Sequence, residues 1–165
     1  MRRIPDVRIV RWELKAAYVV VAYLLGFAIG SLLRAAELAD VIVGLFAAAI
    51  DLTAILLGAR VFRGRGEAIE PPRRWWRMTA RPTLSWVLGI LFLALWIAGV
   101  LGVASDTLGV GGAAPMAADD LALTIVVMAE YGVIAALYLN SAVRLQRLGV
   151  PPREPKFKPT VRIAP

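Results

Sequence analysis

Long apolar runs alternate with short charged segments along the whole chain. The four runs cover residues 16–33, 41–59, 82–105 and 121–143; the first and third contain no charged residue, and the other two contain one acid each. As helices rising about 1.5 Å per residue, such runs cross a hydrocarbon core of about 30 Å. They lack the alternating pattern of barrel strands, so helices are the structure that satisfies their backbone in lipid. We therefore predict an all-α integral membrane protein with four transmembrane helices, at about 16–33, 41–62, 82–105 and 121–147.

The segments between the runs predict how the helices are connected. Residues 34–40 form a short connection, so the first two helices should form an antiparallel hairpin, and the last two should form a second one. Residues 1–15 mix basic and apolar side chains, which is typical of a segment lying at the membrane interface. Residues 149–165 are basic and rich in proline, so we expect an extended tail after a membrane domain spanning 16–148.

Composition and charge agree with a membrane location and predict the orientation. Hydrophobic residues make up 59% of the chain, well above the roughly 45–50% of soluble domains. Of the 19 Lys and Arg residues, all except Arg34 lie on one side of the predicted membrane. By the positive-inside rule that side is cytoplasmic, so we expect a multi-pass protein of the cell (inner) membrane with both termini in the cytoplasm. Topology already explains these basic residues, which argues against nucleic acid as a partner.

The residue types that are missing narrow the chemistry. The chain has no Cys and no His, which excludes disulfides, Cys/His zinc sites and His-ligated haem. It also lacks a G-x-S-x-G motif, and the acids of its cytoplasmic loop, Glu67 and Glu70, lie in a Gly/Pro-rich stretch and are interpreted as solvated charges. We therefore expect no catalytic residues, no metal site and no cofactor, and we do not expect an enzyme.

Two acids, Asp51 and Glu130, lie in the middle of otherwise uncharged runs. An ionisable group at this depth costs about 2.5–3.5 kcal/mol on insertion scales, so chance occurrence is disfavoured. Both predicted helices run in the same direction, and both acids lie about 15 Å along them, so they lie at nearly the same depth and could meet. No Lys, Arg or His lies within a helix core to neutralise them. Burial away from water favours a neutral carboxyl, and we expect at least one of the two to be protonated at neutral pH.

Small residues predict where helices approach closely. A stripe of small residues flanks Asp51 at helical spacing, which favours a face buried against protein rather than lipid. The residues of this stripe are Gly44, Ala47, Ala48 and Gly58. The Gly-x-x-x-Gly element of the first helix, formed by Gly26 and Gly30, is a plausible surface for packing against this stripe.

Tryptophan and arginine residues flank the helices on the predicted cytoplasmic side. Aromatic rings beside arginines suit the headgroup layer of a bilayer. The residues that we expect there are Trp12, Arg73, Arg74, Trp75, Trp76 and Arg77. An interfacial anchor is the first interpretation of this group, and a site for anionic lipid or a partner is the second.

Three functions remain compatible with this pattern. The first is a non-enzymatic membrane component, either a homo-oligomer or an accessory subunit, in which the acids mediate helix contacts. The second is a small transporter or channel that uses Asp51 and Glu130 to carry protons or cations. The third is a holin-like permeabiliser. The expected partners are the lipid bilayer and either a second copy of the chain or another membrane protein.

Overall fold

A computed structural model describes residues 9–63, 74, 76–109 and 116–149. Its helices are α1 (Trp12–Ala35), α2 (Asp40–Val61), α3 (Pro82–Thr107) and α4 (Ala118–Leu148). All four are long and apolar enough to cross a membrane, which confirms the prediction of an all-helical chain with four candidate spans. The predicted tail, 149–165, lies outside the described residues apart from Gly149.

The helices extend beyond the uncharged runs at several ends. α1 begins at Trp12, one turn before the uncharged run, and α4 begins at Ala118 with Asp119 and Asp120 in its first turn. Acids in a first turn interact favourably with the partial positive charge of a helix N-terminus. Charged residues can therefore continue a helix past the hydrocarbon core into the more polar layer around it.

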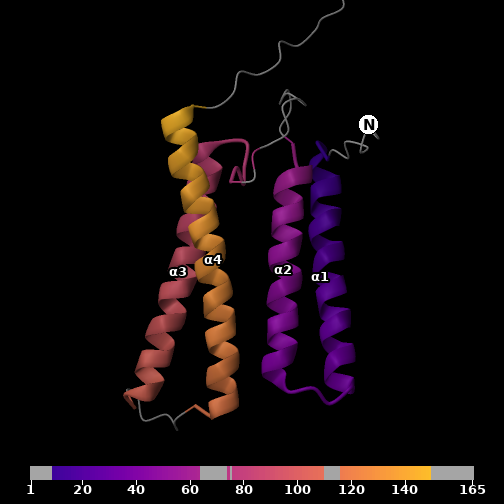
Figure 1. Cartoon of the computed structure of the whole chain (residues 1–165), viewed down its shortest axis with the longest axis vertical. Helices are drawn as coiled ribbons and strands as arrows, with labels where there is room; N and C mark the ends of the chain where they lie inside the picture. The colour runs from indigo at the N-terminus through magenta and orange to yellow at the C-terminus, as the bar shows by residue number, and fades with distance from the viewer. Residues whose placement is uncertain (1–8, 64–73, 75, 110–115, 150–165) are drawn as a thin grey trace, which may run out of the picture.

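The four helices lie in an open row in the order α1, α2, α4, α3 (Figure 1). α2 contacts both α1 and α4, while α3 packs along α4 in the most extensive contact of the fold. Among the described residues, the backbone of α1 makes no close approach to α3 or α4. One end of the row, uppermost in Figure 1, is where α1 and α3 begin and α2 and α4 end. We call it the basic end, because it carries every Lys and Arg that the structure describes except Arg34.

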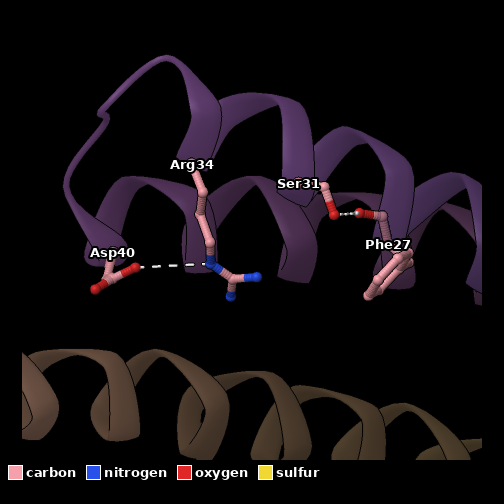
Figure 2. Close-up of polar contacts among 4 residues, drawn as sticks. All are labelled: Phe27, Ser31, Arg34 and Asp40. Atoms are coloured by element: carbon pink, nitrogen blue, oxygen red, sulfur yellow. Dashed lines mark hydrogen bonds and ion pairs between the residues drawn. The ribbon is translucent and has the colours of Figure 1, made fainter.

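At the opposite end, α1 turns sharply into α2. The Leu38 N–H donates to the Leu33 carbonyl (3.2 Å) and the Glu37 N–H donates to the Arg34 carbonyl (2.9 Å). This pair of bonds, with Glu37 at a φ of 56°, is the Schellman arrangement that terminates many helices. The exposed side chains of Arg34 and Asp40 span the turn at 3.7 Å (Figure 2).

Side chains that are fully buried within the chain concentrate between α3 and α4. Ile134 and Leu145 are 1% exposed, and a methyl group at Gly89 would collide with Leu139 of α4. Many other large apolar side chains are exposed, including Val19 on α1 and Leu57 on α2. Such an apolar exterior is what helices present to lipid, because lipid tails are as apolar as the side chains.

Candidate functional site

The central feature of α2 is the face that carries Gly44, Asp51 and Gly58, each seven residues from the next. We call these three residues the Asp51 stripe. A methyl group at Gly44 would lie 2.5 Å from Cδ1 of Leu123, so this end of the stripe abuts α4. At the other end, a methyl group at Gly58 would lie 3.4 Å from the ring of Tyr18, so that end abuts α1. One end of the Asp51 stripe therefore contacts α4 and the other end contacts α1. Asp51 lies midway between these two contacts along α2.

Contacts to α1 continue along the α2 face beside Asp51. The Tyr18 hydroxyl donates to the Ala54 carbonyl at 2.8 Å, and the Tyr18 ring meets Phe62 edge to face at 5.2 Å. Further along α1, a methyl group at Gly30 would lie 3.9 Å from Val43. These contacts fix α1 against α2 along most of its length.

Asp51 lies next to the glycine element of α1. A methyl group at Gly26 would lie 4.0 Å from Oδ1 of Asp51 and 3.8 Å from the Ile50 side chain. Of the other small residues in the predicted stripe, Ala48 is buried and Ala47 is half-buried. Asp51 itself is exposed in the single chain, because α1 and α4 flank α2 without closing over it.

Glu130 of α4 lies near Asp51. The two carboxyl groups are within range of mutual electrostatic repulsion, and Glu130 is half-buried. Within the described part of the chain, neither carboxyl makes a hydrogen bond or an ion pair. The nearby threonines bond to their own helices instead: the Thr53 hydroxyl donates to the Ala49 carbonyl and the Thr124 hydroxyl to the Asp120 carbonyl.

This pair of carboxyls restricts what the site can do. A group of three or more acidic, His or Cys residues with metal-binding geometry does not occur among the described residues. Two carboxyls at mid-helix can bind a proton, share one, or accept a hydrogen bond or a positive charge. None of the described residues supplies that donor or positive charge.

A second polar cluster, which the sequence analysis missed, lies near the basic end between α3 and α4. The Thr79 and Ser85 hydroxyls are 2.6 Å apart, and the Ser85 hydroxyl donates to that of Ser141 at 3.3 Å. The backbone N–H of Met78 donates to the Ser141 hydroxyl at 3.0 Å. Ser85 and Ser141 are both 0% exposed. We call Thr79, Ser85 and Ser141 the hydroxyl cluster; it ties the segment before α3 to α4.

This segment also changes the environment of one predicted interfacial residue. Trp76 is 7% exposed, and the Arg144 guanidinium lies 5.7 Å from the centre of its ring. Trp76 is thus covered by protein, because the segment before α3 folds back against α4. Trp12, by contrast, is 71% exposed.

The arginines predicted to lie beside Trp76 are placed as follows. Arg74 is exposed, and Arg77 is half-buried and donates to the Ala80 carbonyl at 3.3 Å. Arg73 and Trp75 lie outside the described residues.

Comparison of the chain with protein-family models, with curated proteins and with solved structures finds no match.

Proposed function

We propose that this chain is a non-enzymatic, multi-pass component of a membrane assembly. In that assembly, a second copy of the chain or another membrane protein covers the open face of α2 that carries Asp51. The chain supplies two helical hairpins and a pair of carboxyls, and its partner supplies the groups that satisfy them.

The exposure of Asp51 at mid-helix is the observation that carries this proposal. A carboxyl facing lipid costs several kcal/mol on insertion scales, about 2.5–3.5 kcal/mol for an acid at the helix centre. Asp51 is exposed, and within the described residues it has neither a hydrogen bond nor a cation. A partner helix lying beside α2 removes that cost by excluding lipid and offering a hydrogen-bond donor.

The size of the particle extracted from native membranes tests the proposal. After extraction in a mild detergent, light scattering should give a protein mass above the 17.8 kDa of one chain. Asp51→Leu removes the polar group and should release single chains, whereas Asp51→Asn keeps hydrogen bonding and should retain the assembly. Asp119→Leu, an exposed acid outside the apolar runs, is the matched control. A wild-type protein that is monomeric in mild detergent would overturn the proposal.

We place the basic end, with both termini, in the cytoplasm of a cell with an inner membrane. The positive-inside rule supports this orientation, since the basic residues gather at that end. The chain lacks cysteine, so single cysteines can be introduced without removing native ones. A membrane-impermeant maleimide added to intact cells should label Ala36→Cys and leave Gln146→Cys unlabelled. The reverse labelling would contradict the orientation.

A proton- or cation-coupled transporter is the second candidate. Its support is the closeness of Asp51 to Glu130, because two carboxyls within electrostatic range are suited to sharing or exchanging a cation. On this candidate, Asp51→Asn or Glu130→Gln abolishes flux in reconstituted vesicles while Asp119→Asn leaves it unchanged. Flux at the wild-type level in both Asp51→Asn and Glu130→Gln would reject it.

A further inference from the structure

The basic end of the α3–α4 pair concentrates positive charge. Among described residues 74, 76–85 and 140–149, this region contains five arginines and no acid. These residues are Arg74, Arg77, Arg81, Arg144 and Arg147. Arg74, Arg81, Arg144 and Arg147 are exposed.

This charge is carried by a fixed support rather than by a free loop. The hydroxyl cluster joins the segment before α3 to α4 through buried hydrogen bonds. Trp76 packs under Arg144, and the Arg144 Nε donates to Asn140 at 3.0 Å. The guanidinium groups therefore start from an ordered backbone, which lowers the entropy lost when they bind a ligand.

On the α1–α2 side of the basic end, part of the positive charge is engaged in contacts within the chain. The Lys15 ammonium donates to the Arg63 carbonyl at 2.8 Å and lies 5.7 Å from the centre of the Phe62 ring. Arg63 is 6% exposed, and Glu13 adds a negative charge to this side. Lys15 and Arg63 thus contribute to internal contacts, whereas Arg11 and Arg60 are the exposed basic residues of this side.

We propose that the basic end of the α3–α4 pair binds the phosphate headgroup of an anionic phospholipid, through the exposed Arg74, Arg81 and Arg147. A guanidinium group can donate two parallel hydrogen bonds to phosphate oxygens, and several exposed arginines on an ordered backbone are suited to a headgroup. The site lies where α3 enters its apolar span, the depth at which headgroups lie. Leu84 and Val87 of α3, 50% and 64% exposed, follow Arg81 and offer apolar surface for the acyl chain. This inference does not depend on what covers Asp51.

Competition between lipids, read by native mass spectrometry on the purified full chain, tests the site. The chain receives equal amounts of phosphatidylglycerol and phosphatidylcholine with identical acyl chains, and the retained lipids are counted. Phosphatidylglycerol should be preferred, and Arg81→Gln/Arg147→Gln should reduce the preference by roughly tenfold or more. Arg11→Gln/Arg60→Gln removes the same charge from exposed positions on the α1–α2 side and should change it less than about twofold.

Two further arms separate this site from simpler explanations. Inorganic phosphate and glycerol 3-phosphate, each at the lipid concentration, should not displace phosphatidylglycerol; displacement would indicate a site for soluble phosphate and overturn the lipid assignment. Ser141→Ala leaves the charge unchanged but weakens the support, so it should also lower the preference, with Ser85→Ala as a second variant if circular dichroism shows lost helix. Equal retention of both lipids, equal losses in the two arginine pairs, or full preference in both serine variants would overturn the proposal.

Discussion

Gly26 of α1 lies against the Asp51 carboxyl of α2: a Cβ at Gly26 would be 4.0 Å from Oδ1 of Asp51. That distance is an ordinary van der Waals contact, so Gly26→Ala should be tolerated. Gly26→Leu has no such space and should push α1 away from α2. We expect it to lower the free energy of unfolding by about 1–3 kcal/mol, the usual range for overpacking, measured by thermal unfolding in detergent.

Gly102 supplies the matched control for Gly26. It lies on α3, and a Cβ there would meet nothing within 4 Å. Gly102→Leu should therefore unfold at the wild-type temperature or slightly above it. If Gly26→Leu were as stable as Gly102→Leu, α1 would not pack closely at Asp51.

Gly89 of α3 should tolerate an added side chain less well than Gly26, because both side-chain and backbone atoms of α4 lie against it. A Cβ at Gly89 would lie 2.7 Å from Cδ2 of Leu139 and 3.1 Å from the Leu139 backbone nitrogen. We expect Gly89→Ala alone to cost about 1–3 kcal/mol of stability by forcing α3 and α4 apart. Gly44→Ala should cost less, since its close contact is the end of the Leu123 side chain, which can rotate.

The same unfolding measurement checks these two alanine variants side by side. Gly102→Ala serves as the control, and it should be neutral or stabilising because alanine favours helix over glycine. A Gly89→Ala protein that unfolds together with Gly102→Ala would contradict the close α3–α4 contact.

Glu37 holds the left-handed position of the turn between α1 and α2, at a φ of 56°. Glycine adopts this conformation without steric cost, whereas a β-branched residue there is strained. Glu37→Gly should therefore be neutral or stabilising, and Glu37→Val should destabilise by about 1–3 kcal/mol. Thermal unfolding distinguishes them, with the neighbouring exposed Ala36→Val as a control for β-branching alone. Equal stability of the Gly and Val variants at position 37 would argue against the left-handed turn.

The number of helices and their approximate positions could be predicted from the sequence, because nothing else satisfies the backbone of a long apolar run in lipid. Small residues carried further information. Gly26, Gly30, Gly44 and Gly58 all lie at contacts between helices, where the absence of a side chain allows close approach.

The order of the row could not be predicted, since all four runs are similarly apolar. Which helices pack together depends on the shapes of their side chains, such as Leu139 against Gly89 and Leu123 against Gly44. The burial of Trp76 could not be predicted from the sequence either, because it depends on a contact between distant segments. It depends on a hydrogen bond between Met78 and Ser141, which are 63 residues apart, and local sequence carries no signal for that contact.

The hydroxyl cluster gives the sharpest stability test of the α3–α4 pair. Ser141 accepts the Met78 N–H at 3.0 Å in a fully buried setting, and it also accepts from the Ser85 hydroxyl. Ser141→Ala leaves the buried N–H without this acceptor, which costs about 1–3 kcal/mol when no water replaces it. Ser105→Ala is the control, because the Ser105 hydroxyl is bonded only to its own helix, at the Gly102 carbonyl, and its hydrogen bond is exposed.

Amide hydrogen exchange at Met78 separates this explanation from a general loss of stability. In the wild type this amide should exchange slowly, since it is buried and bonded to α4. In Ser141→Ala it should exchange faster at temperatures where the α4 amides remain protected, because the segment before α3 is released while the helix persists. If Met78 and α4 lost protection together, the hydroxyl cluster would support the whole helix pair rather than the segment alone.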